Sequence, residues 1–242
     1  MQRAIIFGAS GGIGRAISEV LAGAGWSLYI HCSTNWSAAS DLSAGLSHRF
    51  PQQDFIPVKF SFLAEDSAVV AFVNHLLPVN ALVFAQGITD YQLVNGQELT
   101  KVDQLMQVNL ITPIKLTNLL EPVLTKNEFS RIVYLGSVYG GDGSAMEAVY
   151  SSSKAGLERF AQSYAREVAS ANLTVNVLAP GAVDTAMNAQ FDSEAIAALK
   201  AELPIGRLAT TSDIAFWVKT LLDRQSGYLT GQTIYVSGGW LK

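Results

Sequence analysis

Three residues between positions 137 and 154 could together move a proton. The chain reads S-V-Y-G-G-D-G-S-A-M-E-A-V-Y-S-S-S-K from Ser137 to Lys154, and an apolar, alanine-rich run from 155 to 169 follows. Because that run predicts a helix, Tyr150 and Lys154 would lie one helical turn apart on the same face. A cation a few ångströms from a phenol favours the phenolate. The segment therefore predicts a tyrosine whose pKa is lowered by a neighbouring lysine.

The Tyr–Lys pair is weak evidence by itself. Lowering the pKa of a tyrosine from about 10 to about 7 needs roughly 4 kcal/mol, which is large for one contact with a cation. We therefore expect a second charge, such as that of a bound cofactor, to contribute. A Y-x-x-x-K spacing can also arise by chance in a chain that contains 8 tyrosines.

A glycine-rich loop follows the first predicted strand. The apolar run 3–7 leads into G-A-S-G-G-I-G, and from Ile13 the apolar residues recur at helical spacing. In such a strand–loop–helix arrangement, backbone N–H groups at the helix N-terminus can bind a pyrophosphate. Gly8, Gly12 and Gly14 would leave room for the tight turn and for the phosphate. An ordinary strand–helix turn is the alternative, but this context favours dinucleotide binding.

The second predicted strand, 27–31, is followed by C-S-T-N. In dinucleotide folds an acidic residue near this point accepts hydrogen bonds from the adenosine ribose and selects NAD. Cys32 stands where that acid is expected, and Ser33 and Thr34 follow it. Because neutral hydroxyl and amide groups can donate to a 2′-phosphate, the sequence favours NADP. No arginine lies in this stretch to strengthen that choice.

Predicted strands and helices alternate along the chain. Further strands are expected at 55–60, 81–84, 131–135 and 173–179, and helices at 41–50, 102–120 and 155–169. This alternation predicts an α/β fold, namely a Rossmann-type doubly wound parallel sheet with helices on both faces. The chain shows no repeat, low-complexity segment or linker, so residues 1–242 are expected to form a single domain.

The composition excludes several classes of function. A net charge of −4 without a basic cluster argues against a nucleic-acid partner. Cys32 is the only cysteine, and His31, His48 and His75 lack the spacing of a metal site, so we expect neither an intrachain disulfide nor a bound metal. The chain begins with a predicted strand and has no apolar run long enough to span a bilayer. These features predict a cytoplasmic protein without a membrane partner.

Motifs along essentially the whole chain resemble those of the short-chain dehydrogenase/reductase family. They are the glycine loop, Asn109 in Q-V-N-L-I, Ser137, Y-S-S-S-K, P-G-A-V-D-T, P-I-G-R-L-A, Y-L-T-G-Q and V-S-G-G-W. The resemblance implies NADPH-dependent reduction of a ketone to a secondary alcohol. Tyr150 would be the general acid, Lys154 would lower its pKa and bind the nicotinamide ribose, and Ser137 would bind the carbonyl oxygen. Asn109 would position a water molecule that connects Lys154 to solvent.

The resemblance also implies the residues that contact the dinucleotide. Pro180, Gly181 and Thr185 would close over the nicotinamide carboxamide, and the segment 186–203 would form a mobile lid over the substrate. The implied cofactor contacts are Gly8, Ser10, Gly11, Gly12, Ile13, Gly14, Cys32, Ser33, Thr34, Ser61, Phe62, Ala85, Gly87, Tyr150, Lys154, Pro180, Gly181, Val183 and Thr185.

Each catalytic assignment has a structural alternative. Ser137 could merely end a strand, Asn109 could satisfy a helix kink, and Lys154 could be a solvated residue of a first helical turn. For the whole chain, the rival from another class is a nucleotide-binding sensor that keeps the fold without turnover. Relatives of that kind lose the tyrosine or the lysine, whereas this chain retains both.

The chain departs from the family pattern at two strand ends. The usual N-N-A-G after the fourth strand is F-A-Q-G here, so Phe84 and Ala85 replace amides whose hydrogen bonds have to be made elsewhere. The customary aspartate after the third strand is Ser61, which is followed by Phe62. A serine can still contact adenine, but more weakly.

Within the family, the motif spacing resembles that of 3-oxoacyl-acyl-carrier-protein reductases. Those enzymes typically hold the acidic carrier protein with arginines near the ends of two long helices, where this chain has Glu128 and Ala171. The stretches L-Y-I-H-C-S-T-N and P-G-A-V-D-T-A-M-N-A-Q-F instead resemble bacterial elongation factor P 5-aminopentanone reductases. That substrate carries an amine, which Asp142 and Glu147 could bind, although solvated surface acids are the commoner explanation of such a pair. The family commonly forms tetramers, so we expect a homotetramer.

Overall fold

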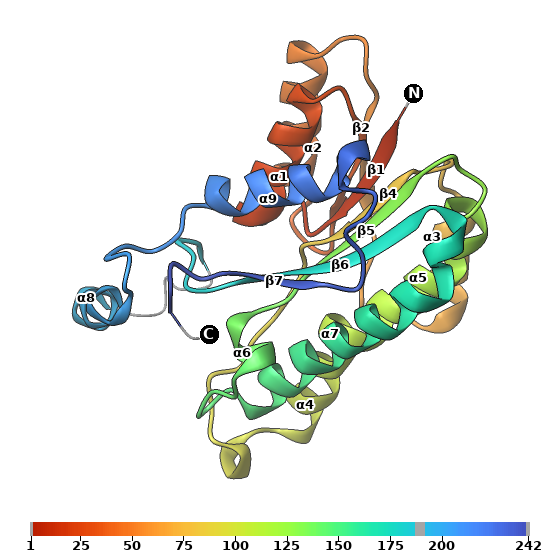
Figure 1. Ribbon diagram of the computed structural model, residues 1–242. Coiled ribbons are helices and arrows are strands. Elements are labelled where there is room, and N and C mark those ends of the chain that lie inside the picture. Colours follow the sequence, from red (N-terminus) through yellow and green to blue (C-terminus); the bar gives the residue numbers. More distant parts are fainter. Residues whose placement is uncertain (1, 187–191, 241–242) are drawn as a thin grey trace.

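A parallel sheet of seven strands runs through the protein, as the computed structural model shows for residues 2–186 and 192–240 (Figure 1). The strand order is β3-β2-β1-β4-β5-β6-β7, which reverses direction at β1 and β4. The predicted doubly wound sheet is therefore confirmed. The strands are β1 Arg3–Phe7, β2 Ser27–Cys32, β3 Phe55–Lys59, β4 Ala81–Phe84, β5 Ser130–Leu135, β6 Leu173–Pro180 and β7 Thr233–Val236.

Helices cover both faces of the sheet (Figure 1). One layer holds α1, α2 and α9, and the other holds α3, α5 and α7. The helices are α1 Gly12–Gly23, α2 Trp36–Arg49, α3 Asp66–Asn74, α4 Leu99–Met106, α5 Thr112–Leu124, α6 Val138–Gly141, α7 Ala148–Val168, α8 Ser193–Glu202 and α9 Thr211–Leu222. Short turns are η1 Val94–Gly96, η2 Gln107–Ile111, η3 Ala169–Ala171 and η5 Arg224–Ser226. In the described part of the chain, no helix has the length and apolarity that a membrane crossing requires.

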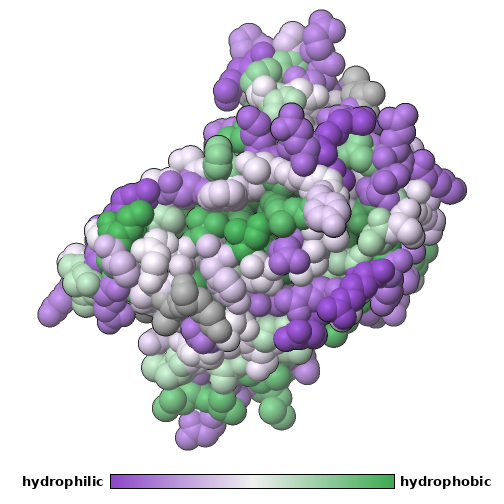
Figure 2. Space-filling model, viewed as in Figure 1, coloured by the Kyte–Doolittle hydropathy of each residue, from purple (hydrophilic) through white to green (hydrophobic). Residues whose placement is uncertain are grey.

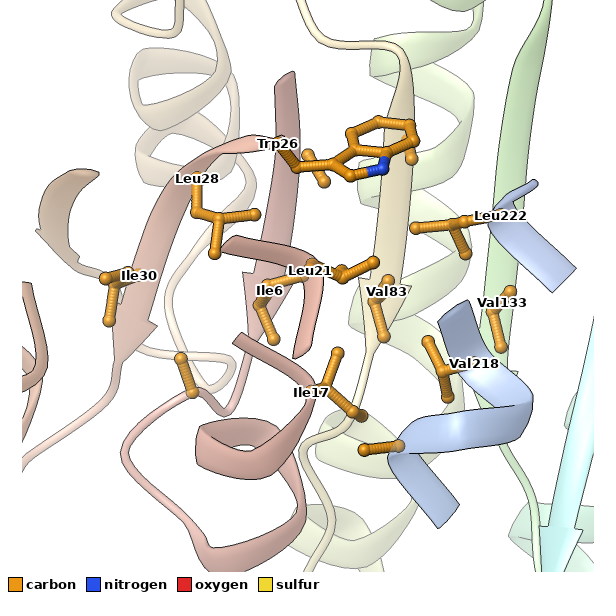
Figure 3. Packing of buried hydrophobic residues seen from close by; sticks show 14 of the residues in the cluster. Ile6, Ile17, Leu21, Trp26, Leu28, Ile30, Val83, Val133, Val218 and Leu222 are labelled. Carbon is orange, nitrogen blue, oxygen red and sulfur yellow. The ribbon is translucent and has the colours of Figure 1, made fainter. Parts of the chain in front are cut away.

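The core beneath α1 and α9 fixes the position of the glycine loop. Ile17 and Leu21 of α1 and Val218 of α9 are fully buried against the sheet (Figure 3). Their partners on the central strands are apolar, and Figure 3 places Ile6, Val83 and Val133 there. Burial of a Val, Leu or Ile side chain contributes roughly 1.5–3 kcal/mol. The start of α1 is thereby held at the carboxyl end of β1.

An aromatic stack replaces the amides expected after the fourth strand. Phe84 pairs in register with Phe7 of β1 and with Tyr134 of β5. The Phe84 ring is stacked on Phe7 at 4.7 Å and on Tyr134 at 4.9 Å between centroids. Aromatic pairs of this kind contribute about 0.5–1.5 kcal/mol beyond their buried area. The three central strands are therefore joined here by stacked rings and not by side-chain amides.

Two predicted helices have different boundaries in the structure. Helix α2 begins at Trp36, five residues before the predicted start at 41, because the side chain of Asn35 accepts the Ala38 N–H at 3.1 Å and caps the helix. The predicted helix 102–120 is divided into α4 and α5 by the π-helical turn η2, which contains Asn109. A π turn inserts an extra residue and is frequent at functional sites.

Candidate active site

A cleft of about 960 Å³ opens at the carboxyl ends of the central strands. Ligands of open α/β sheets bind at this edge, where the strand order reverses. Most of the residues predicted to bind a dinucleotide or act on a substrate line this one cleft. They are Gly8, Ser10, Gly11, Gly12, Ile13, Gly14, Ser33, Thr34, Ser61, Phe62, Ala85, Gly87, Ser137, Tyr150, Lys154, Pro180, Gly181, Val183 and Thr185.

Ser137, Tyr150 and Lys154 meet at the end of β5 and the start of α7. Ser137 follows β5 and caps the short helix α6, where its hydroxyl oxygen accepts the Tyr139 N–H at 3.2 Å. Tyr150 lies in the first turn of α7, and Lys154 one turn later is buried, with its Nζ 5.7 Å from the centre of the Tyr150 ring. The Lys154 ammonium donates to the carbonyl oxygen of Leu135 at 2.8 Å. The predicted proton-transfer group is thus assembled in one place.

The expectation that Lys154 makes Tyr150 acidic is not met in the protein alone. Burial raises the pKa of Tyr150 to about 12, and a hydrogen bond with Ser137 opposes the rise. Burial also lowers the pKa of Lys154 to about 8. Desolvation therefore dominates the pKa of Tyr150 in the protein alone, and what opposes it is the hydrogen bond with Ser137. A protonated phenol is nevertheless the form that a general acid needs before it donates.

Asn109 is buried behind the cleft and does not line it. Its Oδ1 accepts the Ile88 N–H at 3.0 Å, while its Nδ2 donates to the Ile88 carbonyl at 2.9 Å and to Ser153 Oγ at 3.2 Å. A Cβ built on Gly87 would lie 3.6 Å from Asn109 Oδ1 and 3.5 Å from Lys154 Nζ, so both groups border the same glycine. Asn109 therefore fixes the loop after β4 next to Lys154.

The glycine loop fits the diphosphate of a dinucleotide. Gly8 has a φ of +79°, and a Cβ on it would lie 2.7 Å from the backbone nitrogen of Gln86. A Cβ on Gly14 would overlap the carbonyl oxygen of Gly8. Helix α1 begins without a side-chain cap at Gly11 and without an acidic residue in its first turn. Its first N–H groups are therefore left for an anion, as a phosphate requires.

Cys32 does not line the cleft, which corrects the prediction that it contacts the cofactor. Its side chain is fully buried in the core with Ile30 and Ala39. Alternate residues of a strand point to opposite faces, so the neighbouring His31 takes the other side and lines the cleft. Ser33 and Thr34, beyond the end of β2, remain at the cleft.

Sequence reasoning missed the role of His31 in supporting the glycine loop. Its Nδ1 accepts the Gly8 N–H at 3.0 Å, and its Nε2 lies 2.9 Å from the carbonyl oxygen of Phe60. These partners require a neutral ring with the proton on Nε2. Burial lowers the pKa of His31 to about 4, so the ring remains neutral at pH 7. His31 thus connects the glycine loop by hydrogen bonds to the residue that follows β3.

The two acids of the loop before α7 have different surroundings. Glu147 is half-buried and lines the cleft with Tyr150, and its Oε1 accepts a hydrogen bond from Thr89 Oγ1 at 2.8 Å. Burial raises the pKa of Glu147, while hydrogen bonds from Thr89 and Ser144 oppose the rise. Asp142 does not line the cleft. Glu147 is therefore not a solvated surface acid.

The mouth of the cleft also contains aromatic side chains that sequence reasoning did not assign. Tyr139 and Trp240 both line it, and their rings meet edge to face with centroids 5.8 Å apart. Trp240 lies near the end of the chain and Tyr139 just after β5, so no local pattern connects them.

Within residues 2–186 and 192–240, no group of three His, Cys, Asp or Glu side chains could hold a metal ion.

The glycine loop lies where the strand order reverses, and Ser137, Tyr150 and Lys154 lie beside it in the same cleft. This arrangement is typical of a dinucleotide-dependent oxidoreductase. Residues 2–195 match the family model described as short chain dehydrogenase, and the chain belongs to this family. The chain is thus an oxidoreductase of a family that uses NAD(P) to act on CH–OH and C=O groups.

Curated relatives and solved structures cover almost the whole chain. The oxidoreductase YmfI of Bacillus subtilis is 36% identical over 99% of this chain and 98% of its own length. The 3-oxoacyl-[acyl-carrier-protein] reductase FabG of Escherichia coli is 33% identical over 98% and 96%. A putative NAD(P)-dependent gluconate 5-dehydrogenase from Beutenbergia cavernae, solved with bound NADP, is 27% identical with a TM-score of 0.93 over 99% of this chain and 96% of that one.

Proposed function

We propose that this protein reduces a ketone to a secondary alcohol with NADPH. The observation that carries the proposal is the single cleft that joins the glycine cradle to Ser137, Tyr150 and Lys154. The bound cofactor would supply the hydride to the carbonyl carbon. Ser137 would donate a hydrogen bond to the carbonyl oxygen, and Tyr150 would give its proton to the same oxygen as negative charge develops there. Lys154 would hold the nicotinamide ribose and stabilise the phenolate left on Tyr150.

A non-catalytic NADP-binding sensor is the alternative from another class. A sensor needs the glycine loop and could use Lys154 to hold the ribose. It has no need of the Ser137 and Tyr150 hydroxyl groups beside that lysine. Turnover of NADPH with a panel of ketones separates the two functions.

The residues at the end of β2 support NADP as the cofactor. Ser33 and Thr34 line the cleft there with hydroxyl groups, and neither is acidic. A carboxylate at this position would accept bonds from the ribose of NAD and repel a 2′-phosphate. A bound NADP in the Beutenbergia cavernae relative agrees with this preference.

Replacing Ser33 by Asp is expected to lower the NADPH-to-NADH ratio of kcat/KM at least tenfold. Tenfold corresponds to about 1.4 kcal/mol, a modest cost for a carboxylate placed against a phosphate. Steady-state rates with each cofactor measure the ratio, and Ser33→Asn provides a control of similar size without charge. A ratio that moved equally in both variants would show that size, and not charge, governs this position.

A carboxylate inside the cleft supports a substrate that carries an amine. Glu147 lies at the N-terminus of α7 and lines the same cleft as Tyr150. Hydrogen bonds from Thr89 and Ser144 hold its carboxylate in place where it lines the cleft. A bound ammonium would oppose the effect of burial and keep the carboxylate ionised. We therefore propose the 5-aminopentanone group on a modified lysine of elongation factor P as the specific substrate.

The helix ends support the same choice over an acyl-carrier-protein thioester. Glu128, which stands in the place of one expected arginine, is exposed and lies 3.7 Å from Arg224. Ala171 ends the turn η3 and stands in the place of the other. An acidic carrier protein would meet a carboxylate paired with Arg224 at one position and a methyl group at the other. Because several relatives are named 3-oxoacyl-[acyl-carrier-protein] reductase, that thioester is the alternative substrate.

Replacing Glu147 by Gln is expected to raise the KM for the aminopentanone substrate by about 10- to 100-fold. A hydrogen bond to a charged group is worth about 1.5–3 kcal/mol, and the amide removes the charge while keeping the shape. The KM for an uncharged ketone should change less than threefold, which makes it the internal control. Asp142→Asn, in the same loop but outside the cleft, should change neither KM. Equal losses on both ketones would contradict amine recognition.

Direct comparison of the two natural substrate classes tests the specific proposal. Elongation factor P carrying the aminopentanone should be reduced with a higher kcat/KM than a 3-oxoacyl thioester of acyl carrier protein. Faster reduction of the thioester would overturn the inference drawn from Glu128, Glu147 and Ala171.

The segment 186–203 is proposed as the lid of this cleft. Residues 187–191 lie outside the described part of the chain. The described part contains α8, whose residues Ala195, Ile196 and Leu199 line the cleft. A helix that contributes one side of a cleft can open and close over a substrate.

We also propose a cytoplasmic homotetramer. Figure 2 shows apolar side chains gathered in the middle of one face, near α9 and β7. Phe216 and Trp217 of α9 are exposed by 58% and 40%, and β7 forms an edge of the sheet. Exposed edges and apolar patches of this kind are typically covered by a partner. A mass of one chain by sedimentation equilibrium would contradict the tetramer.

A further inference from the structure

A buried carboxylate lies behind the catalytic lysine. In the described part of the chain, Glu158 is the only Asp or Glu among the buried residues, with 8% of its surface exposed. It follows Lys154 by four residues on α7, so Tyr150, Lys154 and Glu158 lie along one face of the helix. Burying a carboxylate is costly unless charge or hydrogen bonds compensate.

The fold makes room for this carboxylate next to Ser137. A Cβ on Gly140 would overlap Oε1 of Glu158, and a Cβ on Gly136 would lie 3.5 Å from it. On the other side, the Tyr235 hydroxyl of β7 donates to Oε2 at 3.3 Å. Glycines before and after Ser137 thus allow Glu158 to reach the segment that presents the catalytic serine.

The polar groups around Lys154 come from β5, η2 and α7. Lys154 is 3% exposed, and its ammonium donates to the carbonyl of Leu135. From η2 the nearby group is the neutral amide of Asn109, and from the first turn of α7 it is the phenol of Tyr150. Burial lowers the pKa of Lys154, and the charge of Glu158 is what opposes that fall. Glu147, just before α7, raises the pKa of Tyr150.

We propose that Glu158 is a positioning residue that keeps Lys154 in its charged form during ketone reduction. The inference rests on the proposed function for its catalytic consequence, but the charge on Lys154 can be measured without substrate. A neutral amine would neither stabilise the phenolate of Tyr150 nor donate all its hydrogen bonds. Glu158 thereby extends the catalytic group by one helical turn into the core.

The direction in which the pKa of Lys154 should change follows from the charge that the substitution removes. In the parent protein the pKa of Lys154 is about 8. Replacing Glu158 by Gln removes a negative neighbour, so the ammonium should lose its proton at lower pH. A fall of about one unit would reduce the protonated fraction at pH 8 about fivefold and leave it almost unchanged at pH 6.

The direct test is a titration of Lys154 by NMR in cofactor-free protein labelled with 13Cε-lysine, assigned with Lys154→Arg. In Glu158→Gln the midpoint should fall by about one unit, whereas Glu158→Asp should stay within about 0.3 units of the parent because the charge is retained. Tyr235→Phe, which removes one hydrogen bond and keeps the carboxylate, should behave like Glu158→Asp. The alkaline limb of kcat/KM should move with the NMR midpoint.

Each result supports or overturns the inference. An unchanged midpoint in Glu158→Gln, or an equal shift in the Asp and Gln variants, would show that the charge of Glu158 does not act on Lys154. A uniform loss of activity at every pH would indicate a packing role and also overturn it. If no ketone were reduced at all, the proposed function would fail, and the NMR shift would still decide the role of Glu158.

Discussion

Replacement of Tyr150 by Phe is expected to lower kcat for ketone reduction by about a thousandfold. A positioned general acid contributes about 10²- to 10⁴-fold to rate, and the phenyl ring removes the proton donor while keeping the shape. The ring also remains beside Lys154, so the dissociation constant of NADPH should stay within about threefold. Oxidation of NADPH by a panel of ketones and a fluorescence titration of NADPH measure the two quantities.

Tyr139→Phe is the matched control for the loss of a hydroxyl in the same cleft. Tyr139 packs against Trp240 and lines the cleft, but its hydroxyl has no role in the proposed proton transfer. Its replacement should lower kcat less than tenfold. Equal rates for Tyr150→Phe and the parent would show that the general acid is another group. A large loss of NADPH affinity would point to a structural role for the hydroxyl.

The state of the catalytic group in the protein alone suits the direction of reduction. Burial raises the pKa of Tyr150 to about 12, so the phenol is protonated and ready to donate at pH 7. Burial lowers the pKa of Lys154 to about 8, so the ammonium is present below that pH. An ammonium that could stabilise the phenolate is therefore in place, while desolvation keeps the phenol protonated in the protein alone.

The fold could be predicted because its central strands are buried on both faces. Such strands read as short apolar runs between glycine and polar turns, and β1, β4 and β5 all have this form. The glycines at 8 and 14 could be predicted because a Cβ at either position would strike backbone atoms. Ser137, Tyr150 and Lys154 are close in sequence, so one strand–helix connection was enough to bring them together.

The same double burial explains why Cys32 was misassigned. A strand with one solvated face shows which residues point inward by its alternation, but all six residues of β2 are buried. The choice between His31 and Cys32 as the residue facing the cleft therefore had no local signal. The π turn at Asn109 also had no local signal, and the side chain of Asn109 bonds to Ile88, twenty-one residues earlier.

Charged residues near the site were the hardest to place from sequence. Glu158 stands on an otherwise amphipathic helix, and a glutamate there is usually solvated. Its burial depends on Gly140 and on Tyr235 of β7, which are distant in the sequence. Glu147 similarly enters the cleft because Thr89, in the loop after β4, holds it. Tertiary contacts of this kind decide whether an acid is a surface residue or part of a site.

Replacement of Gly14 by Ala is expected to destabilise the folded protein by about 3 kcal/mol. The added Cβ would overlap the carbonyl oxygen of Gly8 and lie 2.8 Å from the Cα of Ala9. These are backbone atoms of a turn closed by the Gly11 N–H to Gly8 carbonyl bond at 3.0 Å, so they cannot move aside cheaply. For a chain of this size the melting temperature should fall by roughly 6–12 °C. Differential scanning calorimetry without cofactor measures it.

Gly12→Ala separates this internal clash from the loss of a ligand. A Cβ at Gly12 would lie 3.5 Å from the methyl groups of Thr185 and Thr211, which is ordinary contact, and alanine favours a helix. The melting temperature of Gly12→Ala should therefore stay within about 2 °C of the parent, while NADPH affinity falls because Gly12 lines the cleft. If the melting temperature of Gly14→Ala equalled that of the parent, Gly14 would not be packed against Gly8. If Gly12→Ala melted as early as Gly14→Ala, both glycines would be needed for the fold itself, and neither would be there to make room for a phosphate.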